Sequence, residues 1–251
     1  MPTLLPPEPQ IIEFQAEDGQ TLAGRYYPSA LNPAPLVVLM HWARGDQHDW
    51  DEIALWLQAR QAAGQTPNPQ ALPWLDPSWF PSLPAGRSFA VFTFTFRHCE
   101  GGCKTFTREL WLLDAQAAML AASRLEGIDP QRIVAIGASI GADGAADGCA
   151  WLNAQAAGQC RGALSLSPGS YLTVQYPEVV AGLGALQPPI AVWCLYAQND
   201  DPSAVVCRVK QGEHYRAIEY AGDAHGMSLL QPMLSPNPLQ LFLDFLELTL
   251  P

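Results

Sequence analysis

The chain has 251 residues, of which 49% are hydrophobic and 15% are charged. This is enough apolar material for the buried core of one large or two small domains, and it excludes an intrinsically disordered chain. With 24 acidic against 13 basic residues and a formal net charge of -11 at pH 7, the chain lacks the basic surface that neutralises a phosphate backbone, and we expect no nucleic-acid partner.

The start of the chain is rich in proline. Residues 1–9 contain four prolines and predict an extended linker before a single domain over residues 10–251. Two interpretations stay open for this end: a natural frayed terminus, or a start placed where a targeting segment was cut away. The start lacks the basic and apolar regions of a signal peptide, and no apolar run reaches the roughly 18 residues that span a bilayer. We expect no membrane span.

From residue 10 onward, strand-like runs alternate with helix-like runs, a pattern typical of an α/β protein whose mostly parallel sheet carries helices on both faces. The first two strands flank a polar turn and suit an antiparallel hairpin on one edge. The runs 36–40 and 133–136 are apolar without alternation, as strands buried on both faces are. Eight strands are expected, at residues 11–15, 21–27, 36–40, 89–96, 132–136, 163–166, 190–196 and 214–220, and helices at 50–60, 105–125, 140–153, 203–211 and 238–248.

One segment interrupts this alternation. Residues 64–87 carry six prolines together with Trp74, Trp79 and Phe80, which predicts an inserted loop. Long loops in compact domains are often functional, and rigid aromatic side chains offer apolar area to a ligand. We expect Trp74 and Trp79 to form a wall of the substrate cleft; the alternative is that these aromatics only attach the loop to the surface.

The strand that ends at Ile136 runs directly into Gly137-Ala138-Ser139-Ile140-Gly141, and an alanine-rich helical pattern follows. This is a G-x-S-x-G sequence between a strand and a helix, which is the arrangement of a nucleophile elbow. The helix N-terminus favours developing negative charge beside the serine. Ser139 is the predicted nucleophile.

A serine hydroxyl needs a base in hydrogen-bond reach and an acid that orients the base, in the chain order Ser, acid, His. Of the two histidines after Ser139, only His225 lies in a loop beyond the last expected strand, and it is the predicted base. The strand 190–196 runs into two aspartates. Asp201 is favoured as the acid, and Asp200 remains the alternative, because Asp201 could instead cap the next helix.

Acyl transfer also needs two backbone N–H donors for the oxyanion, one from the residue after the nucleophile and one from a loop after an earlier central strand. Ile140 supplies the first. The loop after residues 36–40 supplies the second, for which Ala43 is favoured and Trp42 is the alternative. His41 is expected to be structural, since His225 already provides the base.

Taken together, these segments resemble an α/β-hydrolase, close to the dienelactone-hydrolase-like esterase branch, over nearly the whole chain. The resemblance implies a Ser-His-Asp hydrolase without metal or cofactor. It rests on the segment from His41 through Gly45 to Trp50, on Gly137-Ala138-Ser139-Ile140-Gly141, on Leu166-Ser167-Pro168-Gly169, on Asp200-Asp201-Pro202 and on Ala224-His225-Gly226.

The sequence also departs from that branch. Trp42 stands where a small residue is common and would narrow the cleft, with Tyr171 as a further candidate wall. The nucleophile is Ser139 rather than the cysteine of true dienelactone hydrolases, which argues against that substrate. The function expected from these features is cleavage of small carboxylic esters through an acyl-enzyme, by a monomer. Alternatives are a peptidase or polyester-depolymerising hydrolase with the same triad, and a non-catalytic binding protein of the same fold.

Six cysteines permit many pairings, but neighbours in the sequence suggest two disulfides. Cys99 and Cys103 flank a short glycine-containing turn, and Cys149 near a helix end lies one short connection from Cys160. The remaining cysteines, on a strand and on its covering helix, are expected to be buried and unpaired, because layers about 10 Å apart exceed the reach of a disulfide. These are Cys194 and Cys207.

No second cysteine pair or histidine cluster completes a tetrahedral set around Cys99 and Cys103, so no metal site is expected. Disulfides are typical of oxidising compartments. The cysteine pattern therefore favours a secreted or cell-surface protein whose targeting segment has been removed, with a cytoplasmic location as the alternative.

Overall fold

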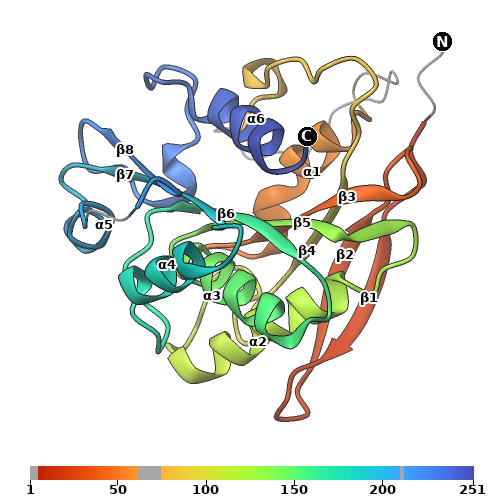
Figure 1. Cartoon of the computed structure of the whole chain (residues 1–251), viewed down its shortest axis with the longest axis horizontal. Helices are drawn as coiled ribbons and strands as arrows, with labels where there is room; N and C mark the ends of the chain where they lie inside the picture. The colour runs from red at the N-terminus through yellow and green to blue at the C-terminus, as the bar shows by residue number, and fades with distance from the viewer. Residues whose placement is uncertain (1–4, 61–74, 210–211) are drawn as a thin grey trace.

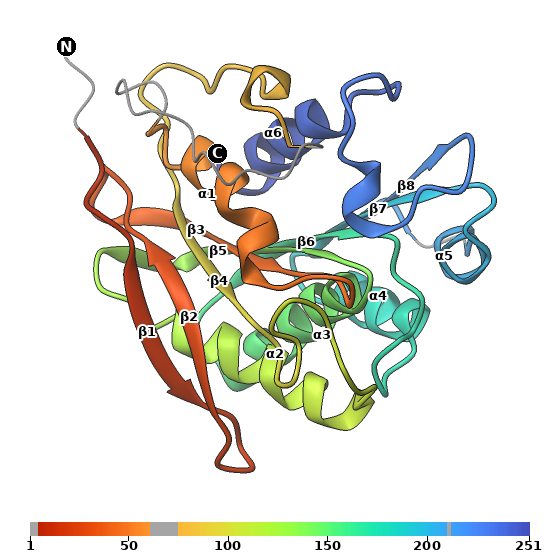
Figure 2. The same ribbon diagram turned by 180° about the vertical axis from the view of Figure 1, so that it is seen from behind.

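The computed structural model describes residues 5–60, 75–209 and 212–251, and Figures 1 and 2 show its elements from two sides. Its centre is an eight-stranded sheet in the order β1-β2-β4-β3-β5-β6-β7-β8. β2 pairs antiparallel with β1 and β4, and all other neighbours are parallel. The strands are β1 (Gln10–Gln15), β2 (Thr21–Tyr27), β3 (Ala34–Met40), β4 (Ala90–Phe94), β5 (Ile128–Ala138), β6 (Cys160–Leu166), β7 (Ala191–Ala197) and β8 (Tyr215–Tyr220).

Helices cover both faces of the sheet, with α1 and α6 on one side and α2, α3 and α4 on the other, while α5 lies at the β7–β8 end (Figure 1). Every residue of β3 and β4 is buried, as is typical of strands with helices on both faces. For β3 the unbroken apolar sequence predicts this burial, whereas β4 contains Thr93. The helices are α1 (Asp51–Leu57), α2 (Arg108–Ala122), α3 (Ile140–Gln155), α4 (Tyr176–Ala185), α5 (Asp201–Cys207) and α6 (Pro238–Thr249), with 3-10 turns η1 (Gln47–Trp50), η3 (Pro77–Trp79) and η4 (Gly226–Leu229).

The expected architecture, eight mostly parallel strands with an antiparallel hairpin at the N-terminal edge, is confirmed. Helix α4 was not among the expected elements. Its sequence, YPEVVAGLGA, contains two adjacent valines and two glycines, which are weak helix formers, and packing against α3 compensates for that low propensity. Among the described residues, none of the helices has the length and apolarity needed to cross a bilayer.

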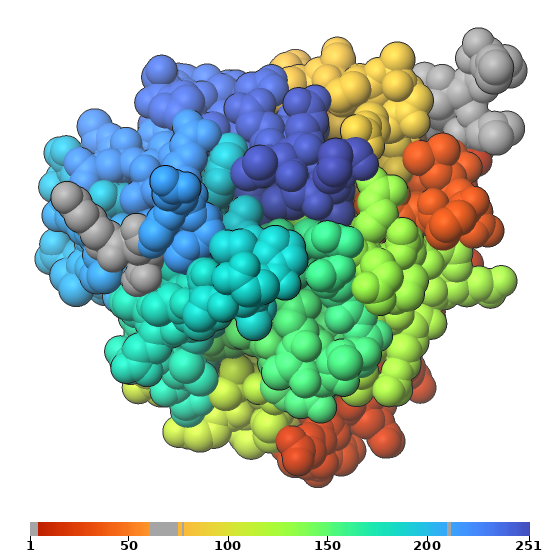
Figure 3. All heavy atoms as spheres, in the orientation of Figure 1, coloured from red at the N-terminus to blue at the C-terminus, as the bar shows by residue number. Residues whose placement is uncertain are grey.

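The parallel strands bring their carboxyl ends to one edge of the sheet. The segments that follow β3, β5, β6, β7 and β8 therefore converge there, which is where open α/β sheets bind ligands. In the space-filling view, α6, α4 and α3, coloured dark blue, cyan and green, form much of the face that is shown (Figure 3).

Candidate active site

Ser139 lies between the last residue of β5 and the first residue of α3, with φ 53° and ψ -117°. A residue with a side chain adopts this conformation only under strain. Its N–H donates to the carbonyl of Leu166, 2.8 Å away, and ties the turn to β6. The glycines of the motif are required by close packing, because a Cβ on Gly137 would collide with the carbonyl of Gly141, and one on Gly141 with that of Met40.

The structure brings Ser139 and His225 together although 86 residues separate them, with 2.8 Å between Oγ and Nε2. The other ring nitrogen of His225, Nδ1, lies 2.8 Å from Oδ2 of Asp200. The Ser203 hydroxyl donates to the same carboxylate oxygen at 2.7 Å. A serine, an imidazole and a carboxylate therefore form one continuous hydrogen-bonded chain at the carboxyl edge of the sheet.

Asp201 was favoured over Asp200 as the carboxylate that contacts His225, and this prediction is wrong. Asp200 occupies the N-cap of α5, where its carbonyl accepts the N–H of Ala204 and its side chain reaches His225. Asp201 is the first residue of α5 and is exposed to solvent. The sequence placed both carboxylates in the same turn, and only the cap geometry separates them.

The surroundings of Asp200 favour its charged form. Burial alone would raise the pKa of this carboxyl, but the hydrogen bonds from His225 and Ser203, together with attraction to His225, hold it below its ordinary value of 3.8. The side chain is only 8% exposed, so bulk water screens the carboxylate little. An ionised carboxylate beside Nδ1 favours the tautomer with its proton on Nδ1, which leaves Nε2 free to accept a proton from Ser139.

The loop after β3 is held by a buried histidine. His41 accepts the N–H of Phe96 through Nε2 at 3.0 Å, so its proton lies on Nδ1, which donates to the carbonyl of Trp42 at 2.7 Å. Burial lowers the pKa of His41 to about 4. This contact fixes the peptide group between Trp42 and Ala43. The N–H of Ala43 makes no hydrogen bond to another residue in the described parts of the chain, and the N–H of Ile140 opens α3, where the first amides lack helical partners.

Trp42 lies against the loop that carries the histidine. Its indole N–H donates to Asp49 at 2.6 Å, and its ring packs on Gly226, where an added Cβ would come within 3.0 Å of the tryptophan and 3.7 Å of the Cβ of Ser139. Burial raises the pKa of Asp49 to about 6, although the hydrogen bond from Trp42 opposes this rise. Trp42 therefore lies close to Ser139, with Gly226 between the two side chains.

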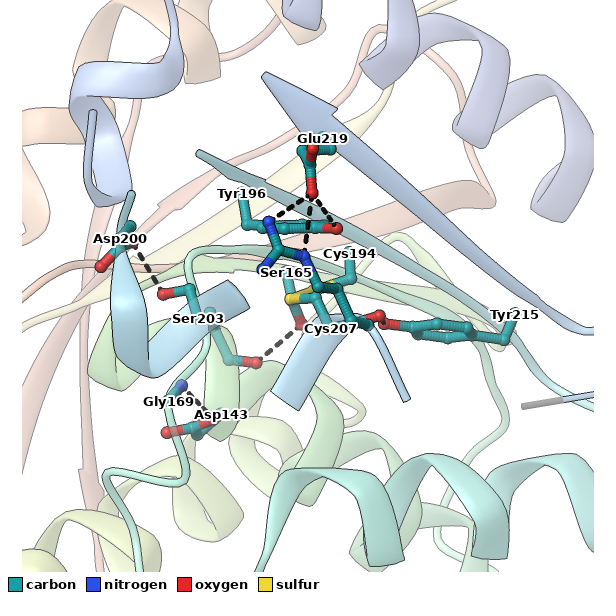
Figure 4. Close-up of a disulfide and its surroundings, with 12 residues drawn as sticks. Asp143, Ser165, Gly169, Cys194, Tyr196, Asp200, Ser203, Cys207, Tyr215 and Glu219 are labelled. Carbon is teal, nitrogen blue, oxygen red and sulfur yellow. Dashed lines mark hydrogen bonds and ion pairs between the residues drawn. A yellow bond between two sulfur atoms is a disulfide. The ribbon is translucent and has the colours of Figure 1, made fainter. Parts of the chain in front are cut away.

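Tyr171 packs against His225, with the two rings edge-to-face and their centroids 6.1 Å apart. The loop that carries it is held by two side chains, Asp143 and Arg108, that were not among the predicted site residues. The buried carboxylate of Asp143 accepts the N–H groups of Gly169, Ser170 and Tyr171, and Arg108 donates to the carbonyls of Ser170, Tyr171 and Leu172. Figure 4 shows Asp143 reaching Gly169 and Ser203 reaching Asp200.

Only part of the proline-rich insertion lies within the described residues, and Trp74 lies outside them. Trp79 packs against the apolar layer under α1 and α6, and Phe80 stacks on Trp56 of α1 with ring centroids 5.3 Å apart. The Trp56 indole also donates to the carbonyl of Pro81 at 2.7 Å. These contacts attach the insertion to α1, and a substrate wall at Trp79 stays a prediction.

Cysteine sulfurs approach to bonding distance in three pairs. Two are the expected pairs, Cys99 with Cys103 and Cys149 with Cys160. The third contradicts the expectation that Cys194 and Cys207 lie too far apart, since their Cα atoms are 6.0 Å apart (Figure 4). The two-turn helix α5 starts directly beyond the end of β7 and its last residue folds back onto that strand, closer than a full helix layer would lie.

Comparison with known proteins finds close likeness of fold and weak likeness of sequence. An esterase of Pyrobaculum calidifontis superposes with a TM-score of 0.65 and 14% identity, covering 94% of this chain and 84% of its own. A thermostable carboxylesterase from a metagenomic library superposes with a TM-score of 0.63 and 16% identity, covering 99% of this chain and 92% of its own. A dienelactone hydrolase of Anabaena variabilis superposes with a TM-score of 0.65 and 12% identity, covering 99% of this chain and 100% of its own. The expected α/β-hydrolase fold, shared by esterases and a dienelactone hydrolase, is confirmed.

No protein-family model matches the chain. An uncharacterized Escherichia coli K12 protein, YfhR, is 30% identical over 130 residues, which make up 52% of this chain. The matched segment spans 38% of that relative.

Proposed function

We propose that this chain, an α/β-hydrolase by its fold, is a serine hydrolase that cleaves carboxylic esters of small molecules. The observation that carries the proposal is the continuous contact from Ser139 through His225 to Asp200, with two links of 2.8 Å each. This is the geometry that activates a serine hydroxyl.

In the proposed reaction, Ser139 Oγ attacks the ester carbonyl carbon while His225 Nε2 takes the hydroxyl proton. Asp200 accepts a hydrogen bond from Nδ1 and stabilises the imidazolium that forms. The oxyanion of the tetrahedral intermediate would accept the N–H groups of Ile140 and Ala43. As the intermediate collapses, its bond to the alkoxy oxygen breaks and His225 gives the proton to that oxygen, so that an alcohol leaves and the acyl group stays bound to Ser139 Oγ as an acyl-enzyme.

The second half of the reaction uses the same groups in reverse. His225 removes a proton from water, the hydroxide attacks the acyl-enzyme carbonyl, and collapse of the second intermediate returns the proton to Ser139 and releases a carboxylic acid. No step calls for a metal or an organic cofactor. Trp42 and Tyr171 would border the bound ester, because both lie beside the nucleophile and its base.

The test is hydrolysis of p-nitrophenyl acetate, butyrate and octanoate by the purified chain, with the Ser139→Ala variant as a matched control. We expect the wild type to hydrolyse at least the short ester and the variant to lose this activity. A wild type no faster than the variant on all three esters would contradict the proposal and favour a binding role for the fold.

We further propose that the three close cysteine pairs are disulfides and that the protein works in an oxidising compartment outside the cytoplasm. Mass spectrometry after alkylation under denaturing, non-reducing conditions tests the pairing. We expect no alkylated cysteine in the untreated protein and six after reduction, since the chain has six cysteines. Alkylation of two cysteines without reduction would show that one pair is not bonded.

A further inference from the structure

The short loop closed by Cys99 and Cys103 lies against the loop that follows β3. It follows β4, the parallel neighbour of β3, so the two loops leave the sheet side by side (Figure 2). Its backbone is tightly folded, because the N–H of Cys99 donates to Phe96 and that of Gly102 donates to Cys99. Cys99 is fully buried.

Three contacts join this small loop to the loop after β3. The N–H of Cys103 donates to the carbonyl of Ala43 at 2.8 Å, and the N–H of Gly101 donates to the Asp46 carboxylate at 2.8 Å. Gly102, at φ +106°, faces the carbonyl of Arg44 so closely that an added Cβ would lie 3.1 Å from its oxygen. The backbone of the small loop is therefore in direct contact with the proposed oxyanion loop.

Hydrogen bonds fix the peptide groups on both sides of Ala43. The peptide group before Ala43 is fixed by His41, which donates to the Trp42 carbonyl. The peptide group after it is fixed by Cys103. With both adjoining peptide groups fixed, the dihedral angles of Ala43 are set, and with them the direction of its N–H.

The span of the cysteine pair indicates a local role. The two cysteines are four residues apart, against separations of 11 and 13 in the other pairs. In the chain-entropy description, a disulfide stabilises a fold less as the loop that it closes becomes shorter. By this description, the Cys99–Cys103 pair contributes the least of the three to the stability of the whole fold. It is nevertheless the pair whose backbone contacts Ala43.

We propose that the Cys99–Cys103 disulfide is a positioning element for catalysis: it holds the Cys103 N–H against the Ala43 carbonyl and thereby aims the Ala43 N–H at the oxyanion. The inference rests on the proposed function. It assigns Cys99 and Cys103 no contact with substrate, and their effect passes through Ala43.

The first test compares two double variants, Cys99→Ser/Cys103→Ser and, as the matched control, Cys149→Ser/Cys160→Ser. Each removes one cysteine pair, but only the first pair contacts the oxyanion loop. The readouts are kcat and KM for p-nitrophenyl acetate, Ki for an alkyl trifluoromethyl ketone, and Tm. The ketone forms a hemiketal with Ser139, and the oxyanion of this hemiketal accepts hydrogen bonds from both N–H donors. The Ki of the ketone therefore measures oxyanion binding in the folded molecules and does not depend on the fraction of the protein that is folded.

We expect the Cys99/Cys103 variant to lose about 10- to 100-fold in kcat, with a Ki raised by a similar factor and KM nearly unchanged, because a misdirected donor weakens only the transition-state contact. The Cys149/Cys160 variant should lower Tm and leave kcat and Ki near their wild-type values. Equal Ki values in both variants and the wild type would overturn the inference.

The second test leaves every cysteine in place and applies if the double variant does not fold. Gly102→Ala puts a methyl group 3.1 Å from the Arg44 carbonyl, whereas Gly101→Ala, also at positive φ, puts one in open space. We expect only Gly102→Ala to lower kcat and raise Ki. If the wild type is active and Gly102→Ala leaves Ki unchanged, the inference is wrong and the proposed function stands. If the wild type is inactive, both are wrong.

Discussion

Replacing Asp200 by asparagine is the change that most sharply separates the two candidate acids. Asp200 Oδ2 lies 2.8 Å from His225 Nδ1 and also accepts the Ser203 hydroxyl at 2.7 Å. An asparagine with its NH2 group at this position would donate to Nδ1 and place the ring proton on Nε2. In that tautomer, His225 cannot accept the proton of Ser139.

The expected loss in kcat is about 10⁴-fold, the size seen when a triad aspartate becomes asparagine and the histidine adopts the wrong tautomer. This factor corresponds to about 5 kcal/mol of transition-state stabilisation, at about 1.4 kcal/mol for each tenfold change. KM should change little, because Asp200 lies behind His225 and does not border the substrate side.

Asp201→Asn is the matched control. Asp201 is exposed at the start of α5, and the loss of its charge should cost about 0.3–1 kcal/mol of stability through the helix dipole, with little effect on kcat. The assay is steady-state hydrolysis of p-nitrophenyl acetate, normalised by active-site titration. A larger loss of kcat in Asp201→Asn than in Asp200→Asn would refute the assignment drawn from the geometry.

Three further predictions follow from the described contacts. Ser139→Ala should lower kcat by several orders of magnitude with an unchanged circular dichroism spectrum, and retained turnover would exclude Ser139 as the nucleophile. Burial raises the pKa of Asp147 from 3.8 to about 8, so the folded chain keeps a proton that the unfolded chain releases near pH 4, and this group lowers stability as the pH rises from there to about 8. Asp147→Asn should therefore raise Tm relative to wild type more at pH 8 than at pH 4; an equal difference at both would contradict the buried, protonated carboxyl. Trp79→Ala should lower Tm, because the ring packs under α1 and α6, and an altered preference among p-nitrophenyl acyl chain lengths would show that it also borders the substrate.

The fold and the positions of Ser139 and His225 could be predicted because their signals are local. A strand, a G-x-S-x-G turn and a helix follow one another directly, and His225 is the histidine in a loop beyond the last strand. The structure places both side chains in contact, and their catalytic roles stay predictions.

What could not be predicted depends on how distant segments meet. Asp200 and Asp201 are chemically equal in the sequence, and the N-cap geometry of α5 alone decides which one turns toward His225. Asp143 lies in an alanine-rich helix, and only the fold brings the loop of Tyr171 onto its carboxylate. Its spacing of four residues after Ser139 puts it one helical turn further along, and this is the one signal that could have drawn attention to it.

The central claim is that Ser139 is an activated nucleophile, and its most direct test is covalent labelling by a fluorophosphonate. The protein is incubated with the probe, residual hydrolysis of p-nitrophenyl acetate is followed, and the labelled peptide is located by mass spectrometry. We predict one adduct per chain, on Ser139, formed in step with the loss of activity and absent when His225 is replaced by alanine. An active protein that takes no label, or an adduct on another serine that accounts for the lost activity, would contradict the proposed mechanism.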